Sequence, residues 1–111
     1  MRKARVNIKG IPAALLTESA PSGTPGAYRL EYLAAYLASP DARPVSLLLP
    51  LRETPYESPR LFPVFDNMLP EGEFRRSLCR ALHSDEDDSF GLLLALAQQD
   101  SIGDITLTLI N

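Results

Sequence analysis

The sequence predicts an α+β fold with a small, mainly antiparallel sheet that includes an N-terminal hairpin, and about three helices in the second half. Apolar and polar residues alternate in the first part of the chain, as they do in half-buried strands. All ten prolines lie between Pro12 and Pro70, so the strands and turns are expected before the helices. The length of 111 residues fits one domain covering residues 1–111.

Strand signals dominate the N-terminal part. Lys9 and Gly10 supply a turn between two short alternating segments, which is typical of a β-hairpin. Residues 19–26 contain two Pro and two Gly residues, so we interpret them as a loop. The predicted strands are residues 5–8, 11–16, 27–33, a short run at 45–49 between two prolines, and 105–110, with residues 51–60 extended.

The first helix signal lies just before the last proline. Phe62, Phe65 and Leu69 stand at i, i+3 and i+7, which is the spacing of one helix face. Pro63 suits a first helical turn, where its missing N–H has no cost. Pro70 disfavours the α conformation at the residue before it. The spacing therefore predicts a helix that begins at Phe62 or Pro63 and ends at Leu69.

Two further helices are expected. The second begins near Pro70 or Glu71, whose carboxylate suits the positive end of a helix dipole. Its expected inward face consists of Phe74, Leu78, Ala81 and Leu82, and its outward face of Arg75, Arg76 and Arg80. The third covers residues 89–98, which are rich in leucine and follow the acidic run 85–88.

Composition excludes several classes of function. The net charge is −3 and the sequence pI is about 5.0, which argues against direct binding of nucleic acid. Cys79 and His83 are single residues of their kind, so we expect no intrachain disulfide and no metal. No apolar run approaches the roughly 18 residues of a membrane helix, and no apolar signal core follows the basic N-terminus. We therefore expect a cytoplasmic protein without a cofactor and without contact to a membrane.

The remaining reactive groups have structural interpretations. Cys79 is expected to be a buried thiol, and His83 a surface or helix-capping residue. The acidic run 85–88 lacks the glycine and glutamate of a calcium loop and is expected to be a solvated helix cap. A small enzyme that uses His83 and Cys79 is an alternative, but we expect a binding protein and no catalytic residue.

Residues 61–72 are the segment whose composition is most consistent with binding to a partner. They combine two phenylalanines, an Asp-Asn pair and the Pro-Glu-Gly sequence at 70–72. Phe62 and Phe65 can fill the core or contact a partner. If both are buried, an interface has to use the polar residues of this corner and the acidic C-terminal half. Gly72 near a helix start costs stability relative to alanine, which indicates that some other group approaches the backbone closely at this position.

Three blocks of the sequence resemble the N-terminal subdomain of HipA-like serine/threonine kinases, the toxins of bacterial toxin–antitoxin systems. They are residues 36–51 (YLASPDARPVSLLLPL), residues 65–72 (FDNMLPEG), and residues 90–93 (FGLL) with residues 99–104 (QDSIGD). The predicted N-terminal hairpin fits as well, so the resemblance covers nearly the whole chain. The 111 residues contain no kinase glycine-rich loop or catalytic loop.

The resemblance implies a function through binding. A free-standing copy is similar to the small HipS-type antitoxin of tripartite HipB–HipS–HipT systems, which binds and neutralises a HipT kinase. The alternative is a fragment of a full-length HipA-like kinase. Whether a HipB-like helix-turn-helix repressor shares the complex stays open, and contact with DNA would be indirect. The candidate partner-binding residues are Phe62, Phe65, Asp66, Asn67, Leu69, Pro70, Glu71, Gly72, Glu73 and Phe74.

Overall fold

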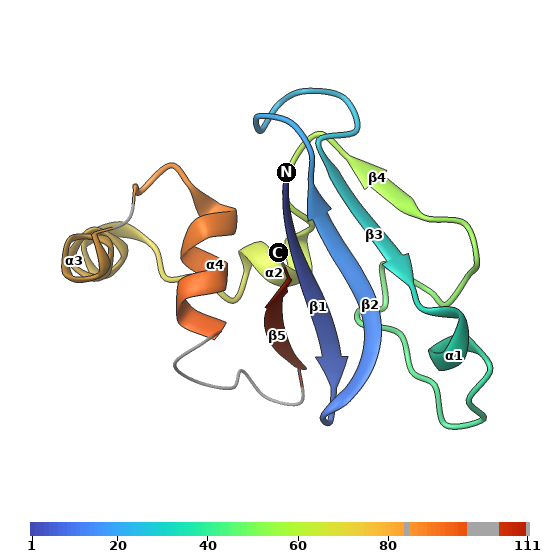
Figure 1. Cartoon of the computed structure of the whole chain (residues 1–111). Coiled ribbons are helices and arrows are strands. Elements are labelled where there is room, and N and C mark those ends of the chain that lie inside the picture. The colour runs from blue at the N-terminus through green and yellow to red at the C-terminus, as the bar shows by residue number, and fades with distance from the viewer. Residues whose placement is uncertain (84, 98–104, 111) are drawn as a thin grey trace.

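The computed structural model describes residues 1–83, 85–97 and 105–110, which form five strands and four helices (Figure 1). The strands make one open antiparallel sheet in the order β4-β3-β2-β1-β5. The α+β class and the N-terminal hairpin are therefore confirmed. The elements are β1 (Arg2–Ile8), β2 (Ile11–Glu18), β3 (Tyr28–Tyr32), α1 (Ala34–Leu37), β4 (Tyr56–Ser58), α2 (Pro63–Asp66), α3 (Gly72–Leu82), α4 (Ser89–Ala97) and β5 (Ile105–Ile110).

The hairpin between β1 and β2 follows from its turn residues. Lys9 and Gly10 both have positive φ, 53° and 79°, as a two-residue hairpin turn of type I′ requires. The register shifts between Val6 and Asn7, where Asn7 faces Pro12. Proline has no N–H to donate to a ladder, and bulges are among the few places where a sheet accepts it.

One face of the sheet carries the core. Ala4, Leu16 and Leu30 stand opposite one another on β1, β2 and β3, and all three are fully buried. Phe65 of α2 and Phe90 of α4 are fully buried in the same cluster. Both helices lie on one side of the sheet, and α3 lies farther out, beyond α4 (Figure 1). The core is thus the layer between the sheet and the helices α2 and α4.

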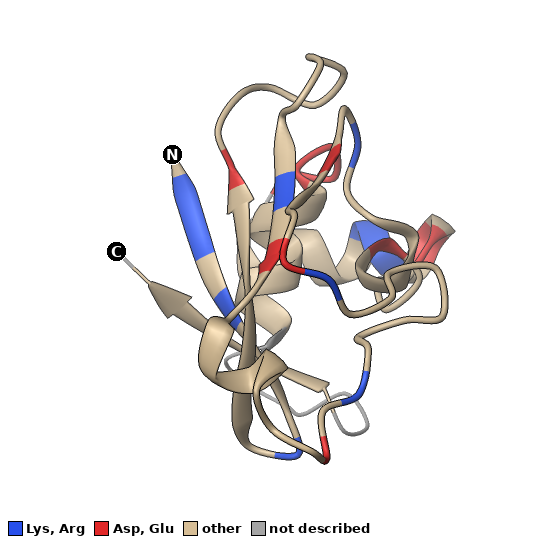
Figure 2. Cartoon of the chain, turned by 90° about the vertical axis from the view of Figure 1, so that its right-hand side faces the viewer, with Lys and Arg blue, Asp and Glu red and all other residues tan. Residues whose placement is uncertain are grey.

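The opposite face of the sheet is charged. Lys3, Thr17, Arg29 and Glu57 form one row across β1, β2, β3 and β4. Lysine and arginine positions recur along β1 (Figure 2), and β3 carries both signs of charge in Arg29 and Glu31. This alternation of a buried and a solvated face is typical of an antiparallel sheet that is covered on one side only.

The predicted strand at residues 45–49 is wrong. This segment is a tight turn, in which the N–H of Leu49 donates to the carbonyl of Ser46 at 3.0 Å. The hydroxyl of the buried Tyr32 accepts a hydrogen bond from the N–H of Val45 and donates one to the carbonyl of Leu49. These backbone groups are therefore not free to pair with a strand. The fourth strand is β4, which lies within the segment expected to be extended, and it pairs with β3.

The helices differ from expectation in length and number. Three helices do lie in the second half, and α4 covers residues 89–97 of the predicted 89–98; residue 98 lies outside the described residues. The helix expected to end at Leu69 is only the short α2. The four-residue helix α1 was not predicted. Among the described helices, none is long and apolar enough to cross a membrane.

Candidate functional site

The candidate site lies where the chain passes from α2 to α3, at residues 66–74, which we call the corner. Phe62 is in extended conformation, and its carbonyl accepts the N–H groups of Phe65 and Asp66 at 3.0 and 3.1 Å. Pro63 is the first residue of the helix, as expected. The N–H of Leu69 donates to the carbonyl of Asp66 at 3.1 Å, and this tight turn forms the first part of the corner.

Three of the candidate partner-binding residues are core residues. Phe65 is fully buried, and Phe62 and Leu69 are 5% and 6% exposed. In this structure their side chains fill the space under the corner and offer almost no surface to a partner. The case in which both phenylalanines are buried therefore applies, and any interface here depends on the other residues of the corner.

The exposed part of the corner is polar and acidic around one aromatic ring. Pro70 is half-buried. The exposed candidates are Asp66, Asn67, Glu71, Gly72, Glu73 and Phe74. Phe74 is 69% exposed, which is unusual for a side chain of its size in a folded domain. The structure thus brings together six exposed candidates within nine consecutive residues.

Phe74 was expected to face inward, and this prediction is wrong. The buried position of α3 is Cys79, at 2% exposure, with Leu78 and Leu82 partly buried beside it. The inward face is therefore rotated by about one residue from the predicted one. This rotation also places Ala81 in solvent rather than in the core.

Gly72 has a conformational role that differs from the predicted one. Its φ is +62°, in the left-handed region that only glycine adopts without strain. A Cβ built on it would meet nothing within 4 Å, so no other backbone approaches it. Among the described residues nothing approaches Gly72 closely, and the glycine instead allows the left-handed entry into α3.

Arginines of α3 hold the helix against the loop that follows it. The guanidinium of Arg75 donates to the carbonyl of Glu86 at 2.6 Å and to the hydroxyl of Ser89 at 3.0 Å. Arg75 was expected to face outward and is instead half-buried. Arg76, exposed as expected, pairs with Glu73 at 2.6 Å and with Glu86 at 3.2 Å. Within the described ranges, no cation pairs with the Glu71 carboxylate.

Cys79 and His83, the two reactive groups singled out in the sequence, occupy the positions expected of structural residues. Cys79 is buried, as predicted. His83 is exposed and takes the left-handed conformation at the C-cap of α3, also as predicted. The two side chains therefore lie in different surroundings. In the part of the chain that the structure describes, no group of three or more His, Cys, Asp or Glu residues is placed to hold a metal ion.

An ionic cluster near α4 was not anticipated. Asp88 accepts the N–H of Gly91 at 3.0 Å, so it caps α4 as the acidic run predicted. It also forms two hydrogen bonds with Arg2, which in turn binds Glu18. Hydrogen bonding to Arg2 holds the pKa of Asp88 below its usual value. Burial, followed by the bond to Glu18, raises the pKa of Tyr28.

A family model describes almost the whole of this chain. The model of the HipA N-terminal domain matches residues 4–108. The chain belongs to the HipA N-terminal domain family. Within this family, a solved structure described as the N-terminal domain of HipA toxin is similar over 100% of this chain and 94% of its own length. The two share 26% sequence identity, with a TM-score of 0.64.

A curated relative of similar length matches part of this chain. An uncharacterized protein of Haemophilus influenzae is 37% identical over 51 residues, which are 46% of this chain and 48% of that protein. The chain is thus matched to about half of the relative's length.

Membership of the HipA N-terminal domain family supports a role related to toxin–antitoxin systems.

Proposed function

We propose that this chain is the inhibitory subunit, or antitoxin, of a HipT-type serine/threonine kinase, which it binds and holds inactive without catalysing a reaction itself. The family membership supports this proposal, because the matched domain is the N-terminal part of a toxin. A HipB-like helix-turn-helix repressor is a second candidate partner, and contact with DNA would then pass through the repressor.

The observation that carries the proposal is the exposure of Phe74. A large aromatic side chain that is 69% exposed gains free energy when a partner pocket buries it, and such residues dominate binding at protein interfaces. Phe74 lies on the first turn of α3, two residues after the left-handed Gly72. Its position is therefore set by the backbone before the partner arrives, which lowers the entropy cost of binding.

Acidic groups around Phe74 favour a basic partner surface. Asp66 and Glu71 are exposed, and no described cation pairs with either carboxylate. The carboxylate of Glu73 forms an ion pair with Arg76. Carboxylates at the rim of an interface attract a basic surface, speed association and disfavour an acidic one. We therefore expect the kinase surface around the Phe74 pocket to be basic.

Co-expression with a HipT-type kinase tests the proposal. The wild-type chain should co-purify with the kinase and restore growth. Phe74→Ala should weaken binding about thirtyfold, the loss of about 2 kcal/mol that defines a dominant interface residue. Glu71→Lys should weaken it as well, with a larger effect at low salt. Ile11→Ala and Glu57→Lys are matched controls away from the corner and should leave binding unchanged.

Folding must be separated from binding in this experiment. Phe65→Ala removes a fully buried ring and should destabilise the chain by about 3–5 kcal/mol, so its loss of binding would report unfolding. Phe74→Ala should keep the wild-type melting temperature. If Phe74→Ala and Glu71→Lys are folded and bind the kinase with wild-type affinity, the corner is not the interface. A wild-type chain that neither co-purifies with the kinase nor restores growth would overturn the proposed function.

The alternative function is that of an N-terminal domain within a longer HipA-like kinase. The description of the matched structure as a domain of the toxin favours it. A reading frame that continues past Asn111 into a kinase body would establish this alternative. An adjacent frame for a kinase without this domain would support the antitoxin.

A further inference from the structure

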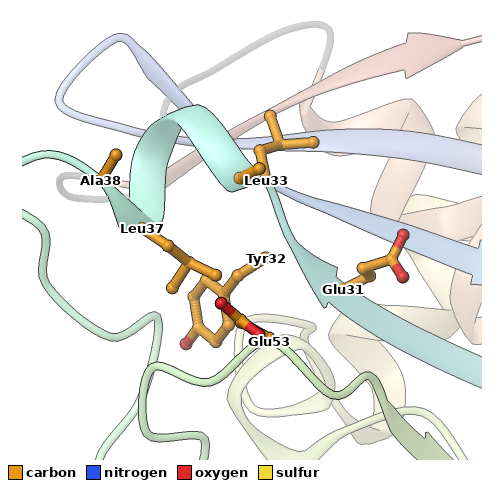
Figure 3. A pocket seen from close by; sticks show the side chains of 7 residues that line it. Glu31, Tyr32, Leu33, Leu37, Ala38 and Glu53 are labelled. Carbon is orange, nitrogen blue, oxygen red and sulfur yellow. The ribbon is translucent and has the colours of Figure 1, made fainter.

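A groove of about 520 Å³ lies between α1 and the segment that follows the turn at residues 45–49. Leu37 of α1, the ring of Tyr32 and the side chain of Glu53 converge from three different segments, while Leu33 and Glu31 lie on the other side (Figure 3). The groove thus combines apolar walls with two carboxylates. It lies at the α1 end of the molecule, away from α3 and the corner (Figure 1).

The charge of the groove is negative and incompletely balanced. Glu31 pairs with Arg29 at 3.3 Å, but both side chains are about half exposed, so water screens this pair. No described cation pairs with Glu53. Its neighbour Arg52 is held elsewhere, since the guanidinium lies 3.5 Å from the centre of the Tyr56 ring and donates to the carbonyl of Thr54 at 2.9 Å.

An exposed apolar turn adjoins the groove through Tyr32. Leu47 and Leu48, at its tip, are 92% and 74% exposed. The hydroxyl of Tyr32 binds the N–H of Val45 at 2.9 Å and the carbonyl of Leu49, so the base of the turn is fixed to a buried side chain. The two leucines are thus presented by an ordered backbone, and little entropy is lost when a partner covers them.

We propose that this groove docks a segment of another protein that carries an arginine or lysine between apolar residues. The aliphatic stem of the basic residue packs on Leu33 and Leu37, and its charge lies near Glu31 and Glu53. The apolar neighbours in the segment cover Leu47 and Leu48. The unbalanced carboxylates select this occupant, because an acidic segment would meet like charge. The site is separate from the corner and does not depend on the proposed kinase contact.

A titration of the ¹⁵N-labelled full chain tests the groove. The probe is the acetylated and amidated peptide Gly-Leu-Arg-Leu-Gly, and the control peptide has Glu in place of Arg. We expect saturable amide shifts confined to residues 31–38 and 45–53 with the Arg peptide, and binding at least about tenfold weaker with the Glu peptide. Equal shifts with both peptides, or shifts outside these segments, would overturn the proposal.

Variants assign the contact to the named side chains. Glu53→Lys should weaken binding of the Arg peptide about tenfold, whereas Asp87→Lys, an equal change of charge near α4, should leave it unchanged. The double variant Leu47→Ser/Leu48→Ser changes exposed residues only and should fold. Weaker binding of the Arg peptide to this variant would therefore show that the peptide contacts the turn. Wild-type affinity of Glu53→Lys or of the double variant would contradict the assignment. A loss of kinase binding in Glu71→Lys would not affect this result.

Discussion

Arg2 and Asp88 form a two-armed ion pair that joins the first strand to the last described helix. Nη1 and Nη2 of Arg2 lie 2.9 and 2.7 Å from the two carboxylate oxygens of Asp88. The same guanidinium binds Glu18 and lies 5.2 Å from the centre of the Phe90 ring. Since Asp88 also caps α4, one carboxylate determines both where the helix starts and where it sits on the sheet.

We expect Asp88→Ala to lower the free energy of unfolding by about 1–2 kcal/mol. About 1 kcal/mol comes from the lost helix cap and up to about 1 kcal/mol from the partly exposed ion pair. Urea unfolding followed by circular dichroism measures the change. Asp87→Ala is the control, because the Asp87 side chain is exposed, and it should alter stability by less than about 0.5 kcal/mol.

The contribution of Asp88 should depend on pH. Arg2 holds the pKa of the folded carboxyl below the value of about 3.9 in an unfolded chain. A group whose pKa is lower in the folded state stabilises above the unfolded pKa and loses this effect as pH falls through the folded pKa. The difference in unfolding free energy between wild type and Asp88→Ala should therefore be constant from pH 7 to about pH 5 and shrink below about pH 4. A difference that stays the same down to pH 2.5 would contradict the role of this pair.

Gly91→Ala should lower the free energy of unfolding. Inside a helix this change usually raises that free energy by up to about 1 kcal/mol. A Cβ on Gly91 would lie 2.2 Å from Oδ2 of Asp88 and 3.0 Å from Nη1 of Arg2, so the ion pair would have to move. Thermal unfolding measures the effect. In the Asp88→Ala background the same change should be neutral or stabilising, and additive effects of the two substitutions would argue against the clash.

Gly72→Ala should cost about 1–2 kcal/mol, since an L-residue is strained at a φ of +62° and no neighbouring atom adds to the strain. Gly72→Asn should cost less, because asparagine tolerates this conformation better. Chemical unfolding of the two variants gives the comparison. Equal stability of the alanine variant and the wild type would show that α3 does not need the left-handed entry.

Tyr32→Phe should destabilise the chain by about 1–3 kcal/mol, because it leaves the N–H of Val45 and the carbonyl of Leu49 without their buried partner. Hydrogen exchange at the Val45 amide should accelerate. Tyr56→Phe is the matched control, since its hydroxyl binds the carbonyl of Pro50 at an exposed position. A larger effect of the control than of Tyr32→Phe would refute this account of the turn.

Local patterns predicted most of the sheet. The hairpin, β3 and β5 follow from alternation and turn residues, which act over a few positions. Residues 45–49 carry an equally good strand pattern, yet Tyr32 and Tyr36 bind backbone groups of this part of the chain and fold it into a turn. Such tertiary contacts leave no trace in the local sequence.

The inward face of α3 at the candidate site was not predicted correctly. Phe74, Leu78, Ala81 and Leu82 fit helical spacing, and so do Arg75, Leu78, Cys79 and Leu82, the face that is turned inward. A helix with few apolar residues does not distinguish two faces that differ by one position. The bonds of Arg75 to the following loop hold the observed rotation.

The Arg2–Asp88 pair spans 86 positions, and no sequence pattern predicts such a contact.

The position of β5 beside β1 determines when this chain can fold. Strands β1 to β3 are made early in synthesis, but the ladder on the other side of β1 waits for residues 105–110. Until these residues leave the ribosome, one edge of β1 and part of its apolar face stay open to other chains. The nascent protein therefore keeps an edge that is prone to aggregation until residues 105–110 have been made.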